Sequence, residues 1–419
     1  MASIDSSPAA STYHVVTAVW GAEFIELFLQ TCVPNQLSPG NLPALPPGSR
    51  YRVLTTAADA PTLAQDGRLD PVRRVLPVDV VAVDMGKAGE AAKPGQIRNR
   101  YQMMTACHRR AVADAADVEA ALIFLAPDII LSEGTMAALV RRHIAGARAV
   151  LTTGLRLSRE SFMAALGADA SARTLPPRQL VALALQHLHP WTDSLMVDGR
   201  SANEFPTSMY WPVRSGERLE GILVRALHLH PLLVDPVRRR ELPRGTIDGH
   251  YLMRCCPKLK ECHVVEDSDE FAVFELTPVE RNIGAQAARR GVPLLRLAAV
   301  SGTCDRYQLS HWQRVIRLHA GEVGDRWTSV EAESLKLVRA LERYRPYGLA
   351  LFRIFTTINF LRQRSDVWAR GVRKRLRPPV STKQVLRPAK LAFHRAVKQG
   401  RLQVKRIRRY GLTRAAFRN

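Results

Sequence analysis

Residues 121–135 constrain the fold more than any other stretch of the chain. They begin with five apolar residues without alternation, Ala121 to Leu125, which is typical of a strand buried on both faces. Pro127 ends this strand, because proline has no N–H to donate to a sheet ladder. Asp128 follows directly, and a second apolar run begins at Ile129. The pattern predicts an acid at the carboxyl edge of a parallel sheet, where open α/β folds bind ligands. The alternative is that Asp128 only caps a turn.

Strand-like and helix-like segments alternate around this stretch, as expected of an α/β fold with a mostly parallel sheet. Strands are predicted over residues 13–20, 51–56, 78–83 and 147–153. Helical spacing is found over residues 22–31, 99–116, 135–144 and 175–186. Farther on, residues 208–213, 221–227 and 271–276 read as strands without regular helical partners, and residues 279–345 read as mostly helical.

The basic residues are concentrated at the C-terminal end. The whole chain has 419 residues and a net charge of +23, and the segment from Leu361 to the end holds nineteen Lys and Arg against one acid, Asp366. Apolar residues interrupt these charges, and they follow the apolar segment Gly348–Leu361. We expect an amphipathic, cationic surface that binds anionic membranes. A solvated tail ranks second and nucleic-acid binding third, because no known nucleic-acid-binding signature is found.

Cysteine usage and the first residues bear on the compartment. The six cysteines are sparse and irregularly spaced, and they match no standard zinc motif. The N-terminus has neither a basic nor an apolar signal region. We therefore expect a cytoplasmic protein with free thiols, associated peripherally with the membrane.

Several enzyme classes lack their motifs here. No Gly-x-Gly-x-x-Gly turn follows the first strand, which disfavours a Rossmann dehydrogenase, and a Walker loop is also missing. No Gly-x-Ser-x-Gly elbow indicates an α/β-hydrolase.

The chain resembles the nucleotide-sugar glycosyltransferases of the GT-A fold, of a bacterial type. The resemblance rests on the order of strands, the helix at residues 99–116, the buried strand at 121–125 and the acid after it. The resemblance covers roughly residues 13–280. It implies a Rossmann-like, mostly parallel sheet, here followed by a helical, basic C-terminal extension. Such enzymes usually place Asp-x-Asp at the end of this strand, and the present chain has Ala126-Pro127-Asp128.

On the donor side, the resemblance implies that Asp128 binds the nucleotide sugar and holds a divalent cation, Mn²⁺ or Mg²⁺, because hard oxygen ligands suit these ions. It also implies a late histidine as a metal ligand, and His230 before Pro231 is the preferred candidate, with a buried structural histidine as the alternative. The strand ends and the basic residues near the same edge supply the other donor-binding candidates: Thr17, Trp20, Gly21, Thr55, Arg98 and Arg100. Trp20 is alternatively a core aromatic.

On the acceptor side, loop acids are candidates for the general base that deprotonates the attacking hydroxyl. Asp248 lies in a turn between two glycines, and Asp267 and Asp269 belong to a run of four acids in five positions. Within the resemblance, these three are the predicted catalytic residues. The alternative is a solvated acidic turn.

These predictions divide the chain into five parts: a disordered N-terminus (1–12), a nucleotide-sugar-binding α/β half (13–160), an acceptor half of the same domain (161–280), a helical region (281–346) and an amphipathic basic membrane-associating tail (347–419). The predicted function is transfer of a sugar from a nucleotide-sugar donor to a glycan or lipid-linked acceptor at the cytoplasmic face of the membrane, as in the synthesis of cell-surface polysaccharide. The alternative is a non-enzymatic protein that binds membranes or nucleic acid through its basic tail.

Overall fold

The structure, a computed structural model, describes residues 12–84, 97–167, 175–281, 286–288 and 293–375. The predicted disordered N-terminus lies almost wholly outside the described residues, and so does the greater part of the basic tail. No helix in the described part of the chain is long and apolar enough to cross a membrane.

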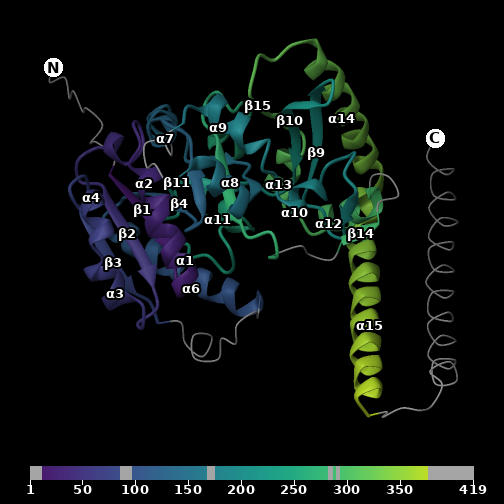
Figure 1. Cartoon of the computed structure of the whole chain (residues 1–419), viewed down its shortest axis with the longest axis horizontal. Coiled ribbons are helices and arrows are strands. Elements are labelled where there is room, and N and C mark those ends of the chain that lie inside the picture. The colour runs from purple at the N-terminus through teal and green to yellow at the C-terminus, as the bar shows by residue number, and fades with distance from the viewer. Residues whose placement is uncertain (1–11, 85–96, 168–174, 282–285, 289–292, 376–419) are drawn as a thin grey trace, which may run out of the picture.

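A seven-stranded, mostly parallel sheet forms the centre of the molecule (Figure 1). Its strands in spatial order are β12 (Cys262–Val264), β6 (Ala149–Thr152), β11 (His230–Val234), β4 (Ala121–Leu125), β1 (Tyr13–Ala18), β2 (Arg50–Thr55) and β3 (Val78–Ala82). Only β11 runs antiparallel to its neighbours β4 and β6. The unbroken apolar run in β4 is buried along its whole length, as predicted, because strands cover both of its edges and its side chains are packed on both faces.

Helices cover this sheet and connect its strands. The longest of them, α6 (Ile97–Asp117), packs against β1, β2 and β4. The remaining helices of this half are α1 (Ala22–Leu27), a π-helical turn (Phe28–Cys32), α2 (Val33–Gln36), α3 (Ala60–Gln65), α4 (Asp70–Arg73), α7 (Thr135–Ile144), α8 (Arg159–Leu166), α9 (Pro177–Ala184), α10 (Pro190–Asp193) and α11 (Tyr251–Cys255). The predicted helix at residues 135–144 agrees with α7.

Smaller sheets extend the central one. In the first, β13 (Val273–Thr277) lies between β5 (Ile129–Leu131) and β7 (Leu155–Ser158). In the second, β10 (Arg218–Ala226) lies between β9 (Ser208–Ser215) and β15 (Ile316–His319). A short pair joins β8 (Ser201–Asn203) to β14 (Gln286–Ala288). The strand β15 lies within the region predicted as mostly helical, because its pairing with β10 is a long-range contact that local pattern does not reveal.

The C-terminal helices pack on the β9–β10–β15 sheet around a second hydrophobic cluster. They are α12 (Leu294–Ser301), α13 (Arg306–His311), α14 (Asp325–Tyr344) and α15 (Gly348–Arg375). The first turns of α15 contact α12, where Gly348 and Gly302 allow the two backbones to approach closely. Figure 1 shows the rest of α15 extending away from the body of the molecule.

Because proline has no N–H to donate, the sequence predicts that a strand ends at His230, directly before Pro231. The structure differs, since His230 begins β11 and Pro231 lies within it. The register of β11 against β6 shifts between Pro231 and Leu233, so the missing N–H falls at an irregular point of the ladder. This position is one of the few at which a sheet tolerates proline.

Candidate functional site

A cavity of about 230 Å³ opens at the carboxyl edge of the central sheet. The ends of β4 and β6 contribute Ala126 and Thr152, and the antiparallel strand β11 brings His230 to the same edge. Arg156 of β7 and Glu275 of β13 line it from the adjoining sheet. Parallel α/β sheets bind ligands at this edge, so the cavity is the candidate functional site.

One ring nitrogen of His230, Nδ1, has no hydrogen-bond partner among the described residues. Its Nε2 lies 3.1 Å from the backbone oxygen of Phe124. A carbonyl oxygen only accepts hydrogen bonds, so Nε2 carries the proton, and in the neutral ring Nδ1 holds the lone pair. The second histidine of this segment, His228, also lines the cavity, and burial lowers its pKa below the usual value. Because side chains alternate along an extended segment, the spacing of His228 and His230 predicts that both lie on one side of it, and both line the cavity.

Asp248 lines the same cavity from the segment between β11 and α11. Its Oδ1 is buried and has no hydrogen-bond partner among the described residues. Its backbone oxygen accepts a hydrogen bond from Nε2 of Gln308 at 3.4 Å, which ties the turn to α13. A buried carboxylate oxygen without a partner is costly unless a ligand or ion supplies one.

Asp128 is not among the lining residues, but it stands in the chain between two of them, Ala126 and Ile129, and its carboxyl interacts with the charges of Glu275 and Arg156, which line the cavity. Its backbone oxygen accepts a hydrogen bond of 2.8 Å from the N–H of Leu276, which fixes the turn against β13. Burial raises the pKa of the Asp128 carboxyl above its usual value, and the nearby charge of Glu275 raises it further. This carboxyl therefore holds a proton more readily than an ordinary aspartate.

Arg156 also lines the cavity and is held in a fixed position by its neighbours. Its Nε lies 3.2 Å from Glu275, its neighbour across the β7–β13 pairing, and its guanidinium lies 4.5 Å from the centre of the Trp191 ring. The backbone oxygen of Arg156 accepts hydrogen bonds from the N–H of His189 and the hydroxyl of Thr192, which flank Trp191. The strand and the α10 segment are thus locked together around this side chain.

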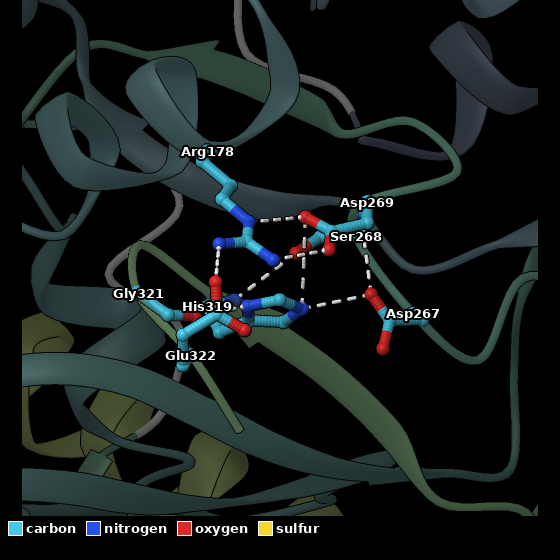
Figure 2. Close-up of polar contacts among 7 residues, drawn as sticks. All are labelled: Arg178, Asp267, Ser268, Asp269, His319, Gly321 and Glu322. Carbon is cyan, nitrogen blue, oxygen red and sulfur yellow. Dashed lines mark hydrogen bonds and ion pairs between the residues drawn. The ribbon is translucent and has the colours of Figure 1, made fainter. Parts of the chain in front are cut away.

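The other predicted catalytic acids form a separate group, shown in Figure 2, which does not line the cavity. Asp267, Asp269 and His319 bring ligand atoms within 4.8 Å of one another, a spacing that could hold a metal ion. In the observed arrangement, however, Nε2 of His319 contacts Asp267 at 2.8 Å and Nδ1 contacts the backbone oxygen of Gly321 at 2.6 Å. Both partners only accept, so both ring nitrogens carry protons and neither offers a lone pair to a metal. Arg178 donates two hydrogen bonds to Asp269, at 2.8 and 2.7 Å, and occupies that carboxylate.

The predicted donor-binding residues of the first strands lie elsewhere. Thr17 is buried and its hydroxyl contacts that of Tyr51 at 3.1 Å. Trp20 packs against the main core, which agrees with the alternative prediction of a core aromatic. Gly21 has a φ of +79° and donates its N–H to Asp59 at 3.1 Å, and Thr55 is buried at the end of β2. None of these four residues lines the cavity.

Arg98 and Arg100 lie in the first turn of α6. The side chain of Arg98 is outside the described part of the structure, and that of Arg100 is half-buried without lining the cavity. Of the residues predicted for the site, His230 and Asp248 therefore line the cavity, and Asp128 lies next to it without lining it.

Sequence reasoning missed Arg156, Trp191 and Glu275. A signal existed for Glu275, because it is the single charged residue in the apolar run Phe271–Leu276, and a charge inside a buried strand needs a partner. Arg156 follows the predicted strand at residues 147–153 by three positions, again at a strand end. No local pattern marks Trp191, which reaches the cavity only through tertiary packing.

Comparisons with known proteins give no family assignment. No family model matches the chain, and no curated protein matches it. Among solved structures, it is similar to mouse xyloside xylosyltransferase 1 (12% identity, TM-score 0.23, 36% of this chain and 56% of that one). It is also similar to residues 1–349 of S. aureus TarS (10% identity, TM-score 0.32, 82% and 90%) and to the Pyrobaculum calidifontis mannosyltransferase PcManGT in complex with GDP-Man and Mn²⁺ (12% identity, TM-score 0.27, 89% and 82%). The chain spans little more than half of the xylosyltransferase. Because all three TM-scores lie below 0.5, the proposals below rest on the residues of the site.

Proposed function

We propose that this protein is a glycosyltransferase of the GT-A type, which transfers a sugar from a nucleotide-sugar donor to a glycan or lipid-linked acceptor at the cytoplasmic face of a membrane. The observation that carries the proposal is the convergence of His230, Asp248, Glu275 and Arg156 on one cavity at the carboxyl edge of a mostly parallel sheet, beside Asp128. The cavity is smaller than the roughly 300–1,000 Å³ of typical small-ligand sites, so it suits the reacting part of a larger donor.

Asp248 is the proposed general base. Of the three acids predicted to act in catalysis, it is the one that lines the cavity, and its Oδ1 has no partner among the described residues. In the proposed reaction, an acceptor hydroxyl attacks the anomeric carbon and the bond from that carbon to the phosphate oxygen breaks. The nucleoside diphosphate leaves with the bonding electrons, and Asp248 takes the hydroxyl proton. Asp267 and Asp269 keep, in this proposal, a supporting role outside the cavity.

A divalent cation, Mn²⁺ or Mg²⁺, is the proposed cofactor, held by Asp128 and His230. The lone pair on Nδ1 of His230 suits such an ion, and a carboxylate such as that of Asp128 supplies the hard oxygen ligand. When bound, it would offset negative charge on the leaving diphosphate. The raised pKa of Asp128 means that binding to this carboxyl displaces a proton.

The C-terminal helix supports membrane association. Toward its outer end, Ile358, Phe360 and Leu361 are 37%, 56% and 48% exposed, and the strongly basic segment begins at the same point. Exposed apolar side chains next to a cationic segment match the chemistry of an anionic membrane surface. The alternative function, a non-enzymatic protein that binds membranes or nucleic acid, rests on this region alone.

The direct test is incubation of the purified protein with UDP-, GDP- and CMP-sugars in the presence of Mn²⁺, followed by measurement of donor hydrolysis and thermal shift. We expect at least one donor to raise the melting temperature and to be hydrolysed slowly without acceptor. EDTA should reduce that hydrolysis. If no nucleotide sugar binds, the glycosyltransferase proposal fails. Binding to anionic vesicles would then favour a non-enzymatic membrane-binding protein, and binding to duplex DNA would favour a nucleic-acid-binding one.

A further inference from the structure

Arg156 has more binding capacity than its contacts in the protein use. Its ion pair with Glu275 is made through Nε, at 3.2 Å. Among the described residues, neither of its two terminal nitrogens donates a hydrogen bond, although the residue lines the cavity. These two nitrogens form the planar fork that binds carboxylates and phosphates in a bidentate manner.

The side chain is also immobilised before any ligand arrives. The Trp191 ring lies 4.5 Å from the guanidinium carbon, and Glu275 fixes the Nε edge. The Arg156 backbone is tied at 2.8 Å to the hydroxyl of Thr192, so the strand and the stacking ring move as one unit. A cation that is already oriented loses little conformational entropy on binding, which favours tight capture of an anion.

Among the described residues that line the cavity, no other supplies a permanent positive charge. The remaining titratable groups that line the cavity are His228, His230, Asp248, Glu275 and Tyr210. Burial holds His228 toward its neutral form, and the two acids are negative when ionised. An anionic ligand that enters this cavity can therefore pair with Arg156.

We propose that Arg156 is the anion receptor of the cavity and that its terminal nitrogens bind a phosphate group of the substrate. The inference deepens the proposed function, because it rests on that cavity being the donor site, and it assigns the capture of the diphosphate to this chain's own residue. It replaces Arg98 and Arg100 as the basic group proposed to meet the leaving diphosphate, and Arg100 does not line the cavity. The same phosphate chemistry occurs in a lipid-phosphate acceptor, and the test separates the two sources.

The test measures pyrophosphate binding to the full-length protein by calorimetry, once with Mn²⁺ and once with EDTA. We expect Arg156→Gln to weaken binding on the order of 10- to 100-fold in both media, as for loss of a charge-assisted bidentate contact. Arg156→Lys keeps the charge but not the fork, so a smaller loss is expected. The matched control is Arg214→Gln, because Arg214 pairs with Asp198 on the surface and does not line the cavity.

A second variant separates the receptor from a merely structural ion pair. Glu275→Gln keeps an acceptor for Nε and removes a negative charge beside the fork, so pyrophosphate should bind as tightly as in the wild type or more tightly. Unchanged affinity in Arg156→Gln, or no pyrophosphate binding by the wild type, overturns the proposal. If Arg156→Gln does not fold, unchanged affinity in Arg156→Lys overturns it instead.

Further measurements distinguish a donor phosphate from an acceptor phosphate, and distinguish failure of the Arg156 proposal from failure of the proposed function. Competition by UDP or GDP assigns Arg156 to the donor, whereas competition by a short-chain prenyl phosphate alone contradicts that assignment. If pyrophosphate binding depends on Arg156 but no nucleotide sugar is turned over, Arg156 is an anion receptor and the glycosyltransferase proposal is wrong. If a nucleotide sugar is turned over equally fast by the wild type and by Arg156→Gln, the glycosyltransferase proposal stands and the proposal for Arg156 is wrong.

Discussion

At the scale of single residues, hydrogen-bond partners decide what each ionisable group can do. Asp248 has an acceptor oxygen without a partner in the described part of the chain, whereas Asp267 and Asp269 have theirs occupied by His319 and Arg178. The three acids looked equivalent in the sequence. Their surroundings make one available for chemistry and place the other two in an ion-pair cluster.

The first prediction compares these acids. Asp248→Asn should reduce transfer about 10²- to 10⁴-fold, the usual range for loss of a general base, without a large change in melting temperature. Asp269→Asn is the matched control and should leave most of the activity. Initial rates with a nucleotide sugar and acceptor provide the measurement. Equal losses in the two variants would contradict the assignment of Asp248.

The second prediction concerns His319 and pH. The hydrogen bond to Asp267, and then that to Gly321, raise the pKa of His319 above its usual value against the opposing effect of burial, and the neighbouring Asp269 adds to the increase. A raised folded-state pKa stabilises the protein fully below the unfolded value of about 6.5, and this contribution is lost as the pH rises through the folded-state pKa.

His319→Gln should therefore destabilise the protein most at acidic to neutral pH, by about 1 kcal/mol, a modest value because the Asp267 carboxylate is half-exposed. Glu322 also interacts electrostatically with His319, and Arg178 lies beside the ring (Figure 2). Thermal melts between about pH 5.5 and 9 for both proteins test the sign. A difference that grows as the pH increases would exclude the imidazolium described for His319.

At the scale of elements, backbone proximity matters as much as side-chain chemistry. The helices α12 and α15 cross where a side-chain carbon on Gly348 would lie 2.5 Å from the backbone oxygen of Ala298, and one on Gly302 would lie 2.3 Å from Gly348. Neither glycine is needed for a positive φ. They are required because two backbones meet there, and this contact anchors the helix that projects from the body.

The third prediction follows from that crossing. Gly348→Ala should cost about 1–3 kcal/mol, because the added methyl group must push the two helices apart. The control is Gly324→Ala, where a new methyl group meets nothing within 4 Å. Denaturant unfolding gives the stability, and limited proteolysis should show earlier cleavage in α15 of the first variant alone. No loss of stability in Gly348→Ala would mean that the crossing relaxes freely.

At the scale of the whole molecule, the cavity and the projecting helix lie in different parts of the chain. The cavity is formed at the edge of the central sheet, and α15 extends from the C-terminal helices (Figure 1). A projecting helix with exposed apolar residues and a basic continuation fits attachment to a surface, with the sheet edge left open for a substrate.

The fourth prediction tests this attachment. Substitution of Ile358, Phe360 and Leu361 together by Glu should weaken binding to phosphatidylserine-containing vesicles at least tenfold, because apolar burial is lost and negative charge is added. Ile144→Glu is the control, since Ile144 is 78% exposed but lies at the end of α7. Vesicle co-sedimentation at low and high salt provides the measurement. Equal vesicle binding by the wild type and the triple variant would show that these residues of α15 do not contribute to membrane binding.

The sequence by itself determined the elements that depend on local pattern. The unbroken apolar run at residues 121–125 could only be buried, and proline had to end it, so β4 and the position of Asp128 followed from elementary chemistry. The clustering of basic residues after Leu361 was also visible without coordinates. These properties depend on residues that are close together in the chain, so they can be inferred from the sequence without knowledge of long-range contacts.

The tertiary structure decided which residues share the site. Arg156, Trp191 and Glu275 are far apart in the chain and meet only because β7 pairs with β13 and the α10 segment folds against both. The insertion of β11 between β4 and β6 likewise brings His230 to the sheet edge, with Pro231 at a register shift that no local rule predicted. Long-range strand pairing sets these contacts, and its free energy depends on packing partners that the local sequence does not contain.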